Sequence, residues 1–310
     1  MFCWCRNSSR RWYAWCSFIG KSFRQIILMK SNLLKKHAKS FYWASFFLSG
    51  NILEKCSSLY NFCRTIDDIV DSDNDLSTKK GIFSKFKKDF EDKNLDNQII
   101  KDMWSVIDSE NISKKIIIDL FDGVETDLEE KVVINSKKEL LVYSYRVAGT
   151  VGLMMSKIMK VKDKEALKGA IDLGIAMQLT NIARDVCEDK ARNRQYVKHD
   201  FLSIRAIINE SQIFYEKSFA SISSIPVKSR FSVIVARRVY RKIGDYILKQ
   251  NNIDNYNKAG KIYVPVFEKV IETFLSVIDF IKLLFIKNLN YDNQLNHNIL
   301  EEEINLNERI

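Results

Sequence analysis

Residues 164–190 read KEALKGAIDLGIAMQLTNIARDVCEDK and carry the pattern of one long helix. Apolar side chains occupy most of its circumference, which is typical of a helix at the centre of a protein. Desolvating carboxylates on such a helix costs several kcal/mol unless a partner offsets the charge. The stretch therefore predicts a central helix whose acidic face meets a cation. Four polar residues at intervals of three or four form that face: Gln178, Asn181, Asp185 and Asp189.

A second acidic helix precedes this one in the chain. Asp67 and Asp71 are four residues apart in RTIDDIVD (64–71), so both carboxylates lie on one face about one turn apart. Asp and Asn oxygens suit a hard cation such as Mg²⁺, with Mn²⁺ as the alternative ion, and Mg²⁺ usually completes its shell with water and phosphates. Two facing helices of this kind would form a cage for a diphosphate. Three arginines are placed to meet its oxygens: Arg64, Arg184 and Arg194.

Two other interpretations of these acids are available. Ordinary solvated helix faces with surface salt bridges would explain each DxxxD motif alone. They leave Gln178 and Asn181 unexplained, because these residues continue the acidic stripe on an apolar helix. A calcium loop over residues 71–82 is rejected, since Leu76 stands where glycine is needed and Ile82 where glutamate is needed.

The composition favours helices throughout. The chain of 310 residues holds 10 Gly and 2 Pro, too few turn-formers for a β-sandwich, a β-barrel or a Gly-looped nucleotide fold. We expect one all-α domain over residues 29–287 and a loose polar tail over 288–310. The last long helix is amphipathic, with charges that argue against a membrane span. Apolar spacing predicts helices over 33–69 (with a break near Ser49–Asn51), 80–93, 97–108, 112–130, 138–159, 164–190, 202–222, 227–250 and 263–287.

Charge and cysteines narrow the class of protein. The formal net charge is +10, but residues 1–53 hold nine Lys or Arg and no Asp or Glu, so the rest of the chain is nearly neutral. No nucleic-acid reading element accompanies this charge, and we expect no nucleic-acid partner. The six cysteines have no zinc-site spacing, which favours free buried thiols in a reducing, cytoplasmic compartment: Cys3, Cys5, Cys16, Cys56, Cys63 and Cys187.

Residues 1–28 differ in composition from the rest and hold three of the six cysteines and three of the five tryptophans. Three interpretations stay open: an organelle-targeting peptide, an anchor at a membrane surface, or an extension before a true start at Met29. We favour the last, because the stretch lacks the apolar core and cleavage site of a secretory signal.

Five segments resemble the squalene/phytoene synthases, which join two prenyl diphosphates head to head. The segments occur in that family's order and spacing, and the resemblance extends over residues 33–287. It implies an all-α isoprenoid-synthase bundle of helices around a central cavity. The five segments are HAKSFYWASFFL (37–48), LYNFCRTIDDIVD (59–71), DGVETDL (122–128), YSYRVAGTVGLMM (143–155) and AMQLTNIARDVCEDKARNRQYV (176–197).

The resemblance also implies a role for individual residues. The implied Mg²⁺-diphosphate ligands are Asp67, Asp68, Asp71, Asn181, Asp185 and Asp189. Tyr143 and Gln178 resemble residues near the reacting carbons. The implied diphosphate contacts are His37, Ser40, Tyr60, Arg64, Arg184, Arg194 and Tyr196. Simpler roles stay open: His37 as a surface histidine, Ser40 as a small packing residue, and Tyr60 and Tyr143 as core aromatics.

The chain departs from the family's pattern at two places. Residues Asn193–Lys198 stand where the family often has Gly-Arg-x-Tyr-Leu-Pro, which puts the conformation of this loop in question. Lys261 stands where the family often has Arg, so the charge is kept but the bidentate fork is lost.

We favour two C20 geranylgeranyl diphosphates as substrates, giving phytoene, because small residues lead into the first acidic motif: Ser45, Ser49, Ser57 and Ser58. The alternatives are C15 farnesyl diphosphate, giving squalene, dehydrosqualene or hydroxysqualene, and a non-catalytic relative that acts as an assembly factor. No nicotinamide-binding fingerprint is present, and NADPH is not expected. The lipid product predicts peripheral contact with a membrane, through the 263–287 helix or the basic N-terminus. The oligomeric state stays open.

Overall fold

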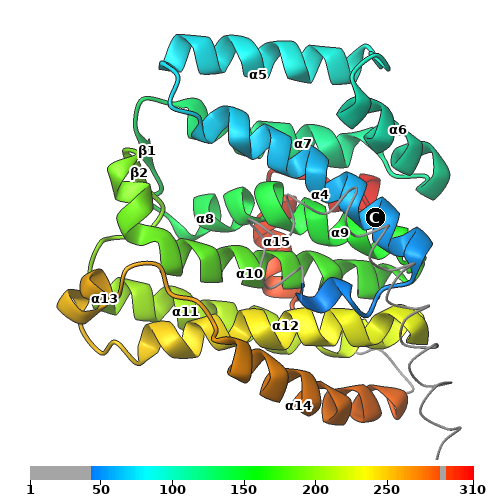
Figure 1. Cartoon of the computed structure of the whole chain (residues 1–310), viewed down its shortest axis with the longest axis vertical. Helices are drawn as coiled ribbons and strands as arrows, with labels where there is room; N and C mark the ends of the chain where they lie inside the picture. Colours follow the sequence, from blue (N-terminus) through cyan, green and yellow to red (C-terminus); the bar gives the residue numbers. More distant parts are fainter. Residues whose placement is uncertain (1–42, 287–290) are drawn as a thin grey trace, which may run out of the picture.

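Helix α10 (Lys164–Ala191) runs through the middle of the molecule, with other helices on both sides of it (Figure 1). The computed structural model describes residues 43–286 and 291–310. The side chain of Asp163 caps the start of α10 by accepting a hydrogen bond from the Ala166 amide at 2.8 Å. The prediction of an all-α bundle with this helix at its centre is confirmed.

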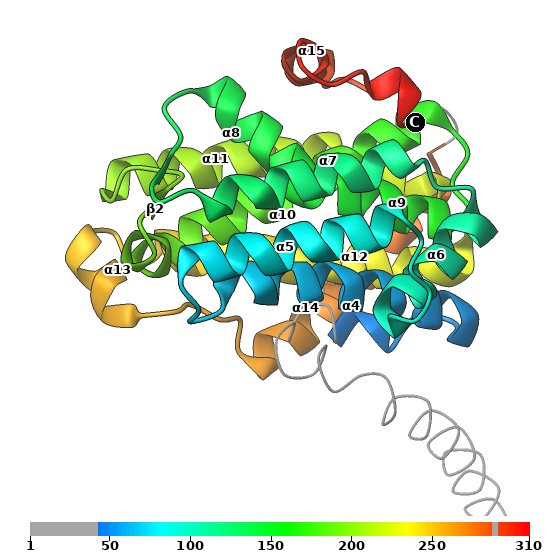
Figure 2. The same ribbon diagram turned by 90° about the horizontal axis from the view of Figure 1, so that it is seen from above.

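The remaining elements surround α10. The helices α9 and α11 pack directly on it, and α14 packs on the outer side of α12 (Figures 1 and 2). Before α10 come α4 (Gly50–Asp71), α5 (Leu76–Glu91), α6 (Gln98–Glu110), α7 (Lys114–Glu125), η1 (Thr126–Leu128), β1 (Val132–Val133), α8 (Lys137–Ser144), the π-helical η2 (Tyr145–Gly149) and α9 (Thr150–Ile158). After it come β2 (Arg194–Gln195), α11 (Phe201–Lys217), η3 (Ala220–Ser224), α12 (Val227–Leu248), α13 (Ile253–Ala259), α14 (Val266–Leu284), α15 (Gln294–Glu301) and η4 (Leu306–Glu308).

Two glycines allow the chain before α10 to touch it backbone to backbone. A Cβ atom added at Gly152 would lie 2.3 Å from the carbonyl oxygen of Ala170. A Cβ added at Gly174 would lie 2.3 Å from the carbonyl oxygen of Ala148. Real Cβ atoms never approach oxygens so closely, so the contact needs glycine. The interior glycine at position 152 is therefore explained by the approach of another helix.

Several helix predictions need correction. The helix expected over 138–159 is divided by the π-helical stretch η2, and α13 was not predicted. The expectation of a loose tail is wrong for residues 291–310, because α15 and the following turn bury Leu300, Ile304 and Leu306. The free thiol of Cys187 is exposed, whereas Cys56 is buried as expected.

On helix α14 charged side chains are buried and most apolar side chains are exposed, the reverse of the usual amphipathic arrangement. Its buried side carries Lys269, Glu272, Ser276 and Asp279, together with Leu283. Arg238 on α12 binds two of these acids, Glu272 at 2.8 Å and Asp279 at 2.7 Å. Its exposed side is apolar: Val266, Phe267, Phe274, Val277, Ile278, Ile281 and Leu284, with Phe285 just beyond the helix. Among the described residues, no helix combines the length and the hydropathy needed to cross a membrane.

Candidate active site

A largely apolar cavity lies against α10 and ends at the acidic residues. The space open to a water-sized sphere is about 320 Å³. Helices α4, α9, α10 and α12 and the stretches η2 and η3 contribute its walls. Asp67, Gln178 and Asn181 lie among its lining residues, and so does Tyr60. The cavity that the resemblance implies is therefore present, and both predicted motifs reach it.

Asp67 on α4 occupies an unfavourable electrostatic position. Asp67 is exposed to solvent at the cavity, yet the protein packed around it raises its pKa to about 7 by desolvation. Arg64 opposes the shift, whereas Asp71 and Asp127 repel the charged form and add to it. In the absence of a further cation, this carboxylate is poorly compensated.

Asp189 on α10 mirrors Asp67 from the other side of the site. Desolvation raises its pKa to about 7, Asp185 adds to the shift, and Arg194 opposes it. Asp127 acts on both Asp67 and Asp189. One carboxylate therefore lies within the electrostatic reach of both acidic motifs, which means that the two motifs face the same region, as predicted.

Asp127, in η1, is the residue of this site that the sequence analysis missed. The hydroxyl of Tyr143 donates to its Oδ2 at 2.9 Å, and the hydroxyl of Tyr196 donates to its Oδ1. The two tyrosine rings stack with centroids 4.7 Å apart. Burial raises the pKa of Asp127, although Arg194 lowers it. The sequence points to Asp127 only through the DGVETDL segment (122–128). Asp127 lies in a short turn there, so no helical motif marks it.

Tyr143 and Tyr196 therefore come together at Asp127. Tyr143 is not among the residues that line this cavity, and its place near the reacting carbons stays a prediction. Its hydroxyl lies 3.1 Å from that of Tyr196, beside Asp127, whose charge acts on both acidic motifs.

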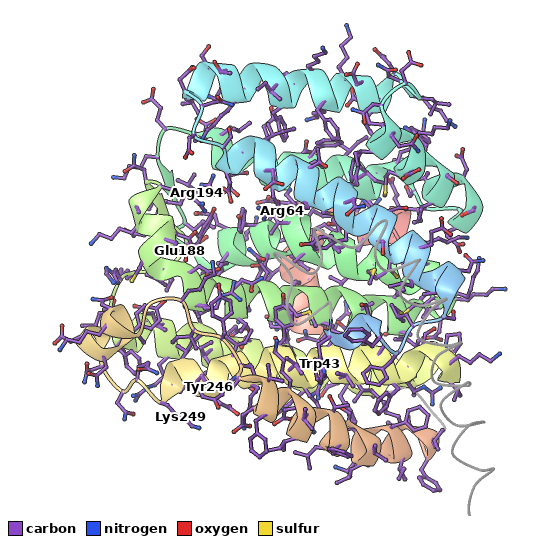
Figure 3. The ribbon with its side chains drawn as sticks, in the orientation of Figure 1. Trp43, Arg64, Glu188, Arg194, Tyr246 and Lys249 are labelled. Carbon is purple, nitrogen blue, oxygen red and sulfur yellow. The ribbon has the colours of Figure 1, made fainter. Side chains whose placement is uncertain are left out.

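Arg194 joins the end of α10 to the first acidic helix, and Figure 3 labels it beside the strands, across from Arg64 on α4. Its Nη1 donates to Asp71 at 2.9 Å, and Nη2 donates to the carbonyl oxygen of Asp127 at 3.3 Å. Strand β2 holds it by pairing in parallel with β1. The preceding residue, Asn193, has a φ of 59°. Asparagine tolerates this left-handed conformation better than most residues, so the loop keeps a glycine-like turn without glycine.

Asp185 lies between two cations. Arg184 forks onto it, with Nε at 2.7 Å and Nη2 at 2.6 Å. The Nζ of Lys261 lies 3.5 Å from Asp185 and 2.6 Å from Glu188. Lys261 thus reaches the second acidic motif. Asp68, in contrast, is half exposed and pairs with Arg64. His37 and Ser40 lie outside the described residues.

A divalent cation fits this set of donors. The ligands are all oxygen atoms, and Asp67 and Asp189 lack full compensation. The Arg64 Nε and the Asn61 Oδ1 are buried without a hydrogen-bond partner. Within the described ranges, no three His, Cys, Asp or Glu side chains already converge as a metal site. Mg²⁺ bound by one or two carboxylates per ion, with phosphate oxygens completing the shell, is compatible with that spacing.

Comparisons with known proteins identify the family of this chain. The profile of the squalene/phytoene synthase family matches residues 34–203, more than half of the chain. The 15-cis-phytoene synthase of Pantoea ananas is 28% identical, with 67% of this chain and 77% of that protein aligned. The chloroplastic phytoene synthase 1 of Zea mays is 29% identical, with 74% of this chain and 63% of that protein aligned.

Solved structures lead to the same fold. A dehydrosqualene synthase in complex with ligand superposes with a TM-score of 0.69 at 25% identity, covering 84% of this chain and 98% of that one. The squalene synthase HpnC from Alicyclobacillus acidocaldarius superposes with a TM-score of 0.61 at 17% identity, covering 74% of this chain and 95% of that one. With the cavity, the two acidic motifs and the family profile in agreement, this chain is a member of the squalene/phytoene synthase family of prenyltransferases.

Proposed function

We propose that the chain condenses two molecules of geranylgeranyl diphosphate head to head, with Mg²⁺, to give phytoene and diphosphate. The observation that carries the proposal is the cavity with both acidic motifs at one end. Its lining is mostly apolar, with several serines along the walls and Asp67, Gln178 and Asn181 at its polar mouth. Such a site suits a prenyl chain with a diphosphate at its head. The named relatives include phytoene synthases, which favours this member of the family's reactions.

Different residues would hold the metal ion and contact the diphosphate. Mg²⁺, when bound, offsets the charge that grows on the departing diphosphate. Asp67, Asp71, Asp185 and Asp189, assisted by Asn181, would hold it, with Asp68 at the outer edge. Arg184, Arg194 and Lys261, which pair with carboxylates here, would also meet phosphate oxygens.

The apolar walls protect the carbon chemistry. Departure of the diphosphate leaves an allylic cation, which the ring faces of Tyr60 and Tyr240 in the cavity lining would stabilise while water is excluded. The double bond of the second substrate attacks this cation, and the new tertiary cation loses a proton as the ring of a cyclopropyl diphosphate closes. A second ionisation, rearrangement and loss of a proton give phytoene without a hydride donor, so NADPH is not needed.

Two of the four small serines support a C20 substrate. Ser45 and Ser57 are among the residues that line the cavity. Ser49 is exposed at the start of α4, and Ser58 bonds to the Glu54 carbonyl oxygen. We expect Ser57→Leu and Ser45→Leu to lower turnover of the C20 diphosphate about tenfold more than that of the C15 diphosphate, the scale on which pocket shape discriminates. Ser49→Leu, outside the cavity, is the matched control.

The direct test incubates the full chain with Mg²⁺ and labelled C20 or C15 diphosphate, without NADPH, and separates the products by chromatography. A C40 hydrocarbon from the C20 diphosphate is the expected result. A C30 product from the C15 diphosphate alone would overturn the choice of substrate and favour the squalene branch. No product from either, with and without NADPH, would favour the non-catalytic relative.

We also propose that the exposed apolar side of α14 rests on a lipid bilayer. Phe267, Phe274 and Phe285 are 74%, 72% and 76% exposed. Trp43, where the described chain begins, donates to Thr273 of α14 at 2.9 Å. The nine basic residues of the acid-free N-terminus precede that contact in the sequence. An apolar helix face in a chain that also carries a basic segment is the pattern of an interfacial anchor on anionic lipids.

Sedimentation with vesicles of phosphatidylglycerol and phosphatidylcholine tests this contact. The full chain should bind, and the double variant Phe274→Glu, Phe285→Glu should bind at least about tenfold more weakly, because charge on the lipid-facing side of α14 opposes insertion. Leu295→Glu is the control, since Leu295 is 82% exposed on α15, on the other side of the molecule (Figure 2). Equal binding of all three proteins, or none by the unaltered chain, would contradict the contact.

A further inference from the structure

The last residues of the chain cross the outside of α7 and α8, on the side away from α14 (Figure 2). Polar contacts with several helices hold this segment, residues 291–310. His297 bonds to Asp172 on α10 at 2.8 Å, and Lys138 pairs with Glu302 at 3.0 Å. Lys115 on α7 pairs with Glu308. A further attachment is Arg309, which connects the segment through Asp119 and Tyr145 to the stretch η2 that lines the cavity.

Arg309 binds a buried carboxylate on α7. Its Nε and Nη2 each donate to Asp119 at 2.9 Å, in a bidentate fork. Asp119 is only 6% exposed, and it also accepts a hydrogen bond at 3.0 Å from the hydroxyl of Tyr145, which is 0% exposed. The fork therefore pairs the buried Asp119 carboxylate with a cation, while its Oδ2 also accepts the hydrogen bond of the tyrosine.

Tyr145 is the first residue of the π-helical stretch η2. Its ring lies over Gly149, the last residue of that stretch, because a Cβ added there would be 3.0 Å from the ring. Between them, Val147 and Ala148 line the cavity. A π-helical turn carries one residue more than an α-helical turn, so a change of register would turn these two residues away from their places.

The same stretch also contacts α10. The carbonyl oxygen of Ala148 meets Gly174, one turn before Gln178 at the cavity mouth. On the other side, a Cβ added at Gly123 of α7 would lie 2.5 Å from the Cβ of Arg146. Asp119 precedes Gly123 by one turn of α7. The hydrogen bond of Asp119 with Tyr145 and the close contact of Gly123 with Arg146 therefore hold the same wall of the cavity.

We propose that Arg309 is a positioning residue for the prenyl-binding cavity. Through Asp119 it holds Tyr145, and through Tyr145 it holds the π-helical register that places Val147 and Ala148 in the wall. The inference rests on the proposed function for its substrate, and it assigns to the C-terminal segment a part in the selection of prenyl chains. A long chain meets more of this wall than a short one, so loss of the tie weakens binding of the C20 diphosphate more.

The test compares Arg309→Ala, Arg309→Lys and Tyr145→Phe with Lys115→Ala in the full chain. We expect Arg309→Ala to raise the KM for the C20 diphosphate about tenfold while kcat stays within about twofold, because the wall binds the chain and does not react. The lysine variant keeps the charge without the fork and should lie between. Lys115→Ala loosens the same segment at Glu308 without touching Asp119, and it should leave KM unchanged.

Two further measurements separate positioning from simple attachment. The double variant Tyr145→Phe, Arg309→Ala should be no worse than either single variant, because both break one chain of contacts. Amide hydrogen exchange of residues 145–149 should rise in Arg309→Ala and not in Lys115→Ala. If Arg309→Ala fails to fold, Tyr145→Phe, which keeps the buried ring, carries the kinetic test.

Unchanged KM and unchanged exchange in folded Arg309→Ala would overturn the proposal, as would an equal effect of Lys115→Ala. If the unaltered chain turns over neither diphosphate, the proposed function fails instead. In that case the exchange of residues 145–149 alone decides whether Arg309 positions this stretch.

Discussion

Asp67 lies at the mouth of the cavity with a pKa raised to about 7 by desolvation and by Asp71 and Asp127, against the opposition of Arg64. Because the folded form binds a proton that the unfolded form releases above its ordinary pKa of 3.8, stability contributed by this group falls as the pH rises from about 4 to 7. Asp67→Asn removes the charge and keeps the shape. Without Mg²⁺, we expect the variant to melt a few degrees higher than the unaltered protein at pH 8, and no higher at pH 5.

The matched control for this experiment is Asp73→Asn, an exposed carboxylate in the loop after α4. Asp73→Asn should show the same difference in melting temperature between pH 5 and pH 8 as the unaltered protein, measured by circular dichroism. A melting temperature of Asp67→Asn that follows that of the unaltered protein at every pH would show that Asp67 is not the strained acid.

Asn193 supports Arg194 through its left-handed backbone. Replacement by Ala should cost about 1–2 kcal/mol of unfolding free energy, because a Cβ without a polar side chain is disfavoured at positive φ. Asn193→Gly should have a free energy of unfolding at least as large as that of the unaltered protein. Urea unfolding measures both, and equal stability of the Ala and Gly variants would contradict the argument.

At the scale of the elements, helix–helix contact explains the glycines of the central pair. Gly152→Ala on α9 should destabilise the protein by about 1–3 kcal/mol, because the new methyl group meets the Ala170 carbonyl oxygen. Gly81→Ala on α5 is the control, since nothing lies within 4 Å of the added Cβ. That change should stabilise by about 0.5–1 kcal/mol through helix propensity. Thermal or urea unfolding of both variants checks the opposite signs.

Most helices were predictable because their apolar spacing is regular. Helix α10 and the break before Gly50 were placed close to where the structure has them. The π-helical stretch at Tyr145–Gly149 was not, because five residues are too few to distinguish its period from that of an α-helix. Helix α15 was missed because its burial depends on partners distant in the chain, such as Asp172 for His297.

The site was predictable where a motif repeats a side chain at helical spacing. Asp67, Asp71, Asp185 and Asp189 follow that rule, and the structure turns both motifs toward one region. Asp127 lies in a short turn, and its importance comes only from the tyrosines and the arginine that fold around it. Which carboxylate an arginine binds is likewise decided by tertiary structure, as with Arg194 and Asp71.

At the scale of the whole molecule, the two acidic motifs belong to helices far apart in the sequence, so a ligand that bridges them stabilises the fold as a unit. We expect Mg²⁺ together with inorganic diphosphate to raise the melting temperature more than either alone. At a concentration one hundred times the dissociation constant, the gain is about 2.7 kcal/mol. Addition of EDTA should reverse it, and the Asp67→Asn, Asp189→Asn variant should show little gain. An equal rise from diphosphate without Mg²⁺ would argue against metal-bridged binding.

The polar attachment of α14 has a consequence for temperature. Apolar burial, which holds most helices of this protein, weakens on cooling. The contacts of Arg238 with Glu272 and Asp279 do not share that dependence, because they involve little change in apolar hydration. Near freezing, the core should therefore loosen before α14 detaches, whereas concentrated salt at room temperature should act on α14 first. Cooling and concentrated salt should therefore disrupt the core and the attachment of α14 in opposite orders.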